Sequence, residues 1–145
     1  MNQDEQQIPG LRDYGAEPVV IDIDCFAKLN TNYRTALWTG EHLQVTLMSI
    51  PVGGDIGLEK HSDLDQFIRI ESGCASVMMG KCKDDLTEWQ NADSNCAVLV
   101  PAETWHNVIN AGNTPLKLYS IYAPPHHPFG AVQKTKEEAE HTEPY

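Results

Sequence analysis

GGDIGLEKHSDLDQFIRIESG, residues 53–73, places the polar side chains Glu59, His61 and Gln66 between two glycine-containing turns. Successive side chains of an extended chain point to opposite faces, so Glu59 and His61, which are two positions apart, would point to the same side. Gln66 opens a second apolar run over residues 66–70, which predicts a strand that ends at a Ser-Gly turn. The segment therefore predicts three polar groups that converge on one site.

A second segment, PAETWHNVIN at residues 101–110, adds His106 on another predicted strand. Glu59, His61, Gln66 and His106 would together supply two imidazole nitrogens and two side-chain oxygens. Divalent first-row metals accept this donor set, and it suits Zn, Mn, Ni and Fe alike. We therefore expect a divalent metal ion as the cofactor, with these four residues as its ligands.

The first segment resembles the first cupin motif, which is usually written G-x5-H-x-H-x(3,4)-E-x6-G. It aligns from Gly53 to Gly73, with Glu59 at the first histidine position, His61 at the second and Gln66 at the glutamate position. The spacing is kept and two ligand identities differ. Because Glu59 replaces the negative charge that Gln66 removes, the aligned set still contains one carboxylate.

The second segment resembles the second cupin motif, G-x5-P-x-G-x2-H-x3-N. Here the motif runs from Asn95 through Pro101 and Glu103 to His106 and Asn110. Asn95 and Glu103 replace the glycines of the pattern. The resemblance thus places His106 at the ligand position of the second motif.

The resemblance covers residues 40–123 and is to the small single-domain cupins. It implies an all-β fold, the cupin double-stranded β-helix, which is a jelly-roll-like barrel. With 145 residues we expect one domain. We predict a flexible acidic arm over residues 1–17, the barrel over residues 18–130 and a flexible charged tail over residues 131–145.

Short apolar runs separated by turn residues also predict an all-β sandwich or barrel. The segment 18–24 is a predicted strand whose edge could pair two copies into a homodimer. A short surface helix is predicted within residues 133–145. The other predicted strands cover residues 33–38, 42–51, 66–71, 75–79, 86–90, 96–100, 106–110 and 116–123.

The composition limits the partners and the compartment. The formal net charge of −11 disfavours nucleic acid and anionic membrane surfaces as partners. No apolar run approaches the length of a membrane span, and the polar N-terminus lacks a signal-peptide core, so we expect a cytoplasmic protein. Cys25, Cys74, Cys82 and Cys96 show no C-x-x-C spacing, which predicts free thiols, mostly as small core residues.

Each candidate ligand also has an ordinary structural interpretation. His61 alone would be taken as an exposed loop histidine, and Glu59 as a solvent-facing acid at a strand edge. Glu59 can also be a general base while the other three residues hold the metal. His106 lies beside Trp105, where a buried imidazole needs a partner, because an unsatisfied buried polar group is costly.

Other side chains are candidates for a substrate pocket. Met48, Phe67, Tyr119 and Tyr122 can line it, although ordinary core packing is the alternative for each. A cupin pocket can also use an arginine to hold an anionic substrate with two parallel hydrogen bonds. The two candidates, Arg34 and Arg69, are both expected on an outer face or at an interface, and the adjacent His126 and His127 are expected at the surface near the pocket mouth.

The resemblance implies a metal-dependent protein that acts on a small polar metabolite such as a sugar, a sugar phosphate or a keto acid. Isomerase or lyase chemistry is the first hypothesis, with the metal as Lewis acid and Glu59 as ligand or base. An Fe(II)-dependent dioxygenase is the alternative enzyme, because Glu59, His61 and His106 form a 2-His-1-carboxylate set. A non-catalytic small-molecule-binding cupin stays open as well, because a fold does not determine a function.

Overall fold

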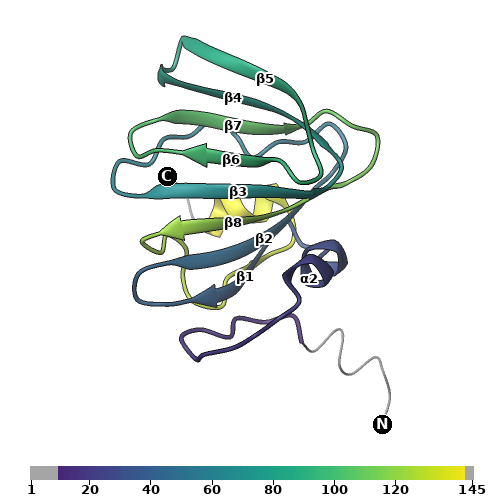
Figure 1. Cartoon of the computed structure of the whole chain (residues 1–145), viewed down its shortest axis with the longest axis vertical. Helices are drawn as coiled ribbons and strands as arrows, with labels where there is room; N and C mark the ends of the chain where they lie inside the picture. Colours follow the sequence, from purple (N-terminus) through teal and green to yellow (C-terminus); the bar gives the residue numbers. More distant parts are fainter. Residues whose placement is uncertain (1–9, 143–145) are drawn as a thin grey trace.

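Two antiparallel sheets form the body of the protein, which is described for residues 10–142 by a computed structural model (Figure 1). The larger sheet has the strand order β6-β3-β8-β2-β1-β9 and the smaller sheet has the order β5-β4-β7. The larger sheet contains β1 (Arg34–Thr39), β2 (Gln44–Ile50), β3 (Asp65–Ser72), β6 (Ala97–Val100), β8 (Leu116–Ala123) and β9 (Val132–Gln133). The smaller sheet contains β4 (Cys74–Cys82), β5 (Asp85–Asp93) and β7 (Trp105–Asn110).

The predicted all-β cupin fold is confirmed, and every predicted strand from residue 33 onward is present with small shifts at its ends. The interior between the sheets is apolar and takes residues from both. Ile70 and Leu118 come from the larger sheet, whereas Val77 and Val108 come from the smaller one. Burial of this shared core provides the main driving force that holds the two sheets together.

Side-chain alternation along β3 follows the prediction. Gln66, Ile68 and Ile70 are buried, whereas Phe67 and Arg69 between them are partly exposed. Because the period of a strand is two residues, Gln66 points into the barrel together with the two isoleucines. The motif residue Gln66 therefore lies on the interior face of the larger sheet.

The predicted strand over residues 18–24 is wrong. Residues 18–22 are extended without strand pairing, and helix α2 (Ile23–Leu29) follows them. The reason lies in Asp22, whose carboxylate accepts a hydrogen bond from the Cys25 amide at 3.0 Å and caps the helix. The structure therefore does not contain the edge strand that was expected to pair two copies, and the homodimer stays a prediction.

The N-terminal segment and α2 cover the outer face of the larger sheet. Ala27 of α2 packs with Leu37 of β1 and Leu47 of β2 in a second apolar cluster. Tyr14 donates its backbone amide to the Leu37 carbonyl at 2.8 Å, so residues 10–17 of the predicted arm are packed against the sheet. The rest of that arm, residues 1–9, lies outside the described residues.

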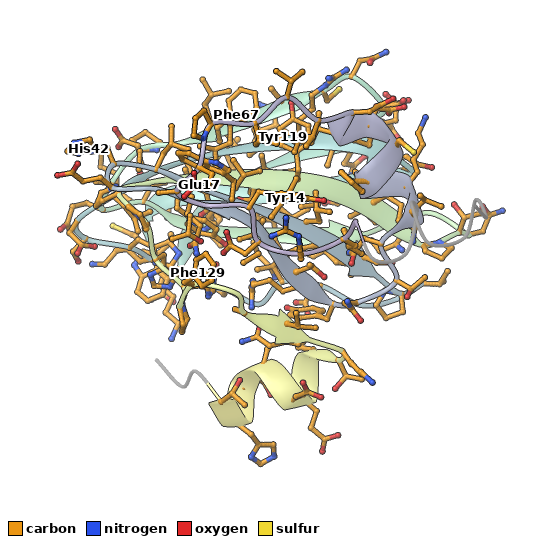
Figure 2. All side chains as sticks on the ribbon, turned by 90° about the horizontal axis from the view of Figure 1, so that it is seen from below. Tyr14, Glu17, His42, Phe67, Tyr119 and Phe129 are labelled. Atoms are coloured by element: carbon orange, nitrogen blue, oxygen red, sulfur yellow. The ribbon has the colours of Figure 1, made fainter. Side chains whose placement is uncertain are left out.

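The predicted C-terminal helix is confirmed as α3 (Lys136–Thr142), on the side of the sandwich opposite α2 (Figures 1 and 2). β9 precedes it and pairs with β1, and Ala139 of α3 is buried in the interior cluster. The described part of the predicted tail is thus part of the packed body. Residues 143–145 lie outside the described part.

Among residues 10–142, no helix has the length and apolarity needed to cross a membrane. All four cysteines are free thiols, as predicted. The expected core placement is wrong for Cys25 and Cys82, which are exposed, while Cys74 and Cys96 are partly buried.

Candidate metal centre and pocket

Glu59, His61 and His106 meet inside the barrel. Their ligand atoms all lie within 4.8 Å of one another, and all three side chains are buried. Nε2 of His61 and Nε2 of His106 each lie 3.5 Å from Oε2 of Glu59. The structure thus brings together three of the four ligands expected from the sequence.

Backbone hydrogen bonds fix this arrangement. The amide of Glu59 donates to the His106 carbonyl at 3.0 Å, and the amide of His106 donates to the Glu59 carbonyl at 2.9 Å. His61 is tied in turn by the amide of Glu103, which donates to its carbonyl at 2.8 Å. These bonds join the loop before β3 to the start of β7 and hold the three side chains in one place.

The histidine nitrogens are arranged as metal ligands usually are. Nδ1 of His106 lies 3.0 Å from the Thr104 carbonyl, so Nδ1 carries the proton and Nε2 presents its lone pair to Glu59 and His61. Among the described residues, neither Nε2 of His61 nor Nε2 of His106 has a hydrogen-bond partner. Because leaving such buried groups unsatisfied is costly, their convergence on a carboxylate fits a bound cation.

Gln66 adds a polar atom from the neighbouring strand. Its Nε2 donates to the Ser120 hydroxyl at 2.8 Å, which directs the amide within the barrel. Its Oε1 is buried and has no hydrogen-bond partner among the residues described. A carbonyl oxygen is a weaker metal ligand than a carboxylate, so the role of Gln66 as a ligand stays a prediction.

Only two of the four expected pocket residues lie in the interior. Met48 and Tyr122 are buried there. Phe67 and Tyr119 instead stack on the outer face, with ring centroids 6.4 Å apart (Figure 2). Their assignment to the pocket is wrong because successive side chains of a strand point to opposite faces. Gln66 on β3 and Ser120 on β8 point inward, so the adjacent Phe67 and Tyr119 point outward.

His126 and His127 belong to the site, and the expected surface placement is wrong for His127, which is buried. The ring centroids of His126 and His61 are 4.5 Å apart, and Nε2 of His127 lies 3.2 Å from the Tyr122 hydroxyl. Gln44 holds this segment, because its Oε1 accepts from the His126 and His127 amides at 3.2 and 2.8 Å. His126 and His127 follow the end of β8, so the alternation that points adjacent side chains of a strand to opposite faces does not apply to them.

Burial keeps His127 neutral. Burial, and after it the positive charge of Arg34, lowers the pKa of His127 to about 2. The unfolded chain takes up a proton near pH 6.5 and the folded chain does not, so stability is fully present above about pH 6.5 and falls as the pH drops below it.

We expect the free energy of unfolding to fall by about 1.4 kcal/mol between pH 7.5 and 5.5 through this residue. Urea titrations of wild type and His127→Gln at both pH values measure the difference. His42→Gln is the matched control, because the His42 side chain is 87% exposed. If the free energy of unfolding falls equally in wild type and His127→Gln between pH 7.5 and 5.5, His127 is not the source of the pH dependence.

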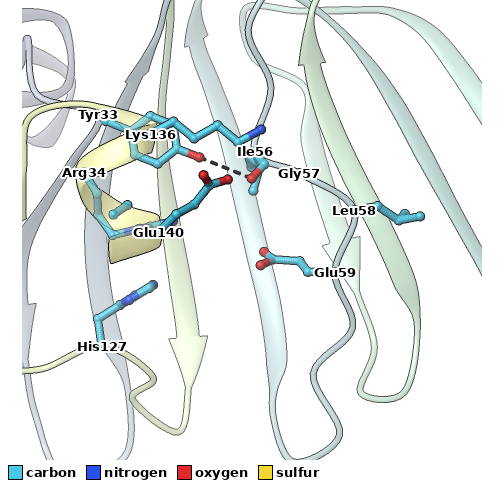
Figure 3. A pocket seen from close by; sticks show the side chains of 10 residues that line it. Tyr33, Arg34, Ile56, Gly57, Leu58, Glu59, His127, Lys136 and Glu140 are labelled. Carbon is cyan, nitrogen blue, oxygen red and sulfur yellow. Dashed lines mark hydrogen bonds between the residues drawn. The ribbon is translucent and has the colours of Figure 1, made fainter. Parts of the chain in front are cut away.

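Arg34 lies in the pocket, and its expected place on an outer face or at an interface is wrong. It is buried on β1 and lines a cavity of about 290 Å³ that also contains Glu59 and His127 (Figure 3). β9 returns along β1 and supplies Gln133, whose Oε1 accepts from Nη1 of Arg34 at 2.7 Å. The chain near the C-terminus therefore encloses this arginine, which no local sequence pattern indicated.

Two tyrosines beside the site keep their protons. Burial raises the pKa of Tyr33 and of Tyr122; the charge of Arg34 opposes this shift and that of Glu59 adds to it. The Tyr33 hydroxyl donates to the Ile56 carbonyl at 3.2 Å (Figure 3). Both tyrosines are consequently neutral at neutral pH; Tyr33 lines the cavity, and the Tyr122 hydroxyl lies beside His127.

Comparison with known proteins agrees with this architecture. The cupin domain family matches residues 46–122. The uncharacterized protein YrkC of Bacillus subtilis is 60% identical over 129 residues, which are 89% of this chain and 69% of that protein. The crystal structure of BH2720 from Bacillus halodurans has 56% identity and a TM-score of 0.88 over 90% of this chain and 98% of that chain.

A more distant match shows the fold alone. KdgF from Halomonas sp. has 15% identity and a TM-score of 0.54 over 64% of this chain and 80% of that chain. The family match covers more than half of the sequence, and the sandwich contains both predicted motifs. The chain belongs to the cupin family.

Proposed function

We propose that this cupin is a metal-dependent enzyme that acts on a small polar metabolite by isomerase or lyase chemistry. The observation that carries the proposal is the pair of buried imidazole nitrogens without hydrogen-bond partners among residues 10–142, each 3.5 Å from Oε2 of Glu59. A purely structural cluster would be expected to satisfy these nitrogens with hydrogen bonds.

Glu59, His61 and His106 would hold the ion, with Gln66 as a weaker fourth donor. These donors suit Zn, Mn, Ni or Fe. When bound, such an ion supplies Lewis acidity that polarises a carbonyl or stabilises an enediolate.

The remaining groups would bind the substrate and move a proton. One carboxylate oxygen of Glu59 would face the ion, and the other would take a proton from the carbon next to a carbonyl of the substrate. Tyr122, which is protonated, would donate a hydrogen bond to a substrate oxygen. His127 is neutral and lies 3.2 Å from Tyr122, which it orients.

Proton exchange in heavy water tests this proposal. Protein loaded with Zn or Mn is incubated in D₂O with 2-oxo acids, sugars and sugar phosphates, and the loss of the α-proton signal is followed by NMR. We expect exchange that needs both the metal and Glu59, so that Glu59→Gln loses at least about 100-fold in rate. The matched control is Glu137→Gln, an exposed residue in the first turn of α3.

The same samples separate the alternatives. Oxygen uptake by Fe(II)-loaded protein would support the dioxygenase, because the three ligands form a 2-His-1-carboxylate set. Saturable binding of a probe without exchange or oxygen uptake would support a non-catalytic binding protein. Either result would contradict the isomerase or lyase proposal.

A further inference from the structure

We propose that the substrate is a short-chain 2-oxo or 2-hydroxy carboxylic acid and that Arg34 binds its carboxylate. This inference rests on the proposed function and names its substrate class. Arg34 would act as a specificity-determining residue, which holds one end of the substrate while the other end lies at Glu59.

The position of Arg34 is the first argument. The residue is only 3% exposed, yet it lines the cavity that also contains Glu59 (Figure 3). A guanidinium is planar and carries five N–H donors in a rigid fork that matches a carboxylate. A buried guanidinium facing a cavity beside a candidate metal centre is therefore suited to bind an anionic group of a ligand.

The guanidinium is also held in place. Gln133 accepts from Nη1 at 2.7 Å, and Cζ lies 5.3 Å from the centroid of the Tyr33 ring. Nε2 of Gln133 in turn donates to the Thr142 hydroxyl of α3 at 3.3 Å. Preorganisation of this kind lowers the entropic cost of binding a ligand, because the side chain is ordered beforehand.

The volume of the cavity limits the size of the ligand. About 290 Å³ lies at the lower end of the range for small-molecule sites. An acid of a few carbon atoms fits such a space. The cavity therefore favours a short carboxylic acid that can reach from Arg34 to Glu59.

The net charge of the groups that line the cavity favours the binding of an anion only when the metal is present. Arg34 and Lys136 line the cavity together with the carboxylates of Glu59 and Glu140, and Lys136 is paired with Asp55. A divalent ion would outweigh the charge of Glu59 and, with Arg34, leave the cavity positive despite Glu140. Removing the charge of Glu140 should then strengthen the binding of an anion.

Arg34 has a simpler alternative role, which is to balance the charge of Glu59. In that case Arg34→Gln would change the affinity for the metal but not the preference for a carboxylate over an amide. The two roles are therefore separated by comparing acids with their own amides, which have nearly the same shape and no charge.

Calorimetric titration of the 145-residue chain provides the test. The probes are pyruvate, glycolate and lactate, each against its amide, with wild type, Arg34→Gln and Arg34→Lys in metal-loaded and metal-free form. We expect at least one acid to bind metal-loaded wild type at least 10-fold more tightly than its amide. Arg34→Gln should lose about 10- to 100-fold in affinity for the acid, and Arg34→Lys should lose less.

Glu140→Gln should bind the same acid about 2- to 5-fold more tightly, as expected for removal of one negative charge near a partly exposed site. Glu137→Gln, on the same helix but outside the cavity lining, is its control and should leave the affinity unchanged. Equal binding of acid and amide, an unchanged preference in Arg34→Gln, or no binding of any probe would overturn the inference. Metal content is measured separately by elemental analysis, so a failure of the metal centre itself is recognised independently.

Discussion

Replacing His106 with alanine is expected to lower the affinity for Zn or Mn by more than about 100-fold, since loss of an outer-shell partner alone costs 10- to 100-fold. His106 is 1% exposed, and its Nδ1 is held by the Thr104 carbonyl at 3.0 Å. Its backbone exchanges two hydrogen bonds with the backbone of Glu59, which fixes the position of the side chain beside that carboxylate.

Competition with a chelator measures this loss of affinity, and elemental analysis of protein prepared without an affinity tag measures the bound metal. His42→Ala is the matched control, because it removes an exposed histidine that has no expected role in metal binding. Circular dichroism and a urea titration establish that His106→Ala is folded. A folded His106→Ala protein with unchanged metal affinity would remove His106 from the ligand set.

Replacing Asp13 with alanine is expected to lower the free energy of unfolding by about 3–5 kcal/mol, because charge-assisted hydrogen bonds contribute about 1.5–3 kcal/mol each and are not additive. Asp13 is buried and accepts four of them. The donors are the Gly15 amide at 2.9 Å, the Thr39 amide at 3.0 Å, the Thr39 hydroxyl at 2.6 Å and the Gly130 amide at 2.8 Å.

The Asp13 bonds also bear on the site. Gly130 lies three residues after His127, so Asp13 holds one end of the segment that Gln44 holds at the other. Urea titration at pH 7 measures the loss of stability. Asp22→Ala is the control, because it removes only an exposed helix cap and should cost about 1 kcal/mol. Equal costs for the two variants would contradict the central position of Asp13.

The two motifs were sufficient to predict the barrel and the meeting of Glu59, His61 and His106. The motif spacing brings the loop that carries Glu59 and His61 beside β7, where Glu59 forms an isolated bridge with His106. The alternation of side chains along β3 placed Gln66 inward, because it depends only on local sequence. Side chains that point inward on paired strands could thus be identified without knowledge of the rest of the fold.

The same rule could not identify residues whose surroundings come from distant parts of the chain. Arg34 is enclosed by β9 and α3, which return from the C-terminus. Phe67 and Tyr119 were assigned to the pocket because they are large and apolar, but the outer face of this sheet is itself covered by α2 and the N-terminal segment. His127 is drawn inward by Gln44, 83 positions earlier in the sequence. Each of these placements depends on tertiary contacts that have no local sequence signal.

Anomalous X-ray diffraction from crystals of the 145-residue chain grown with Zn or Mn tests the metal centre most directly. The account predicts one strong peak within coordination distance of Nε2 of His61, Nε2 of His106 and a carboxylate oxygen of Glu59, at about 2.0–2.2 Å for Zn. The absence of a peak there, or a single peak at another histidine such as His141, would contradict it.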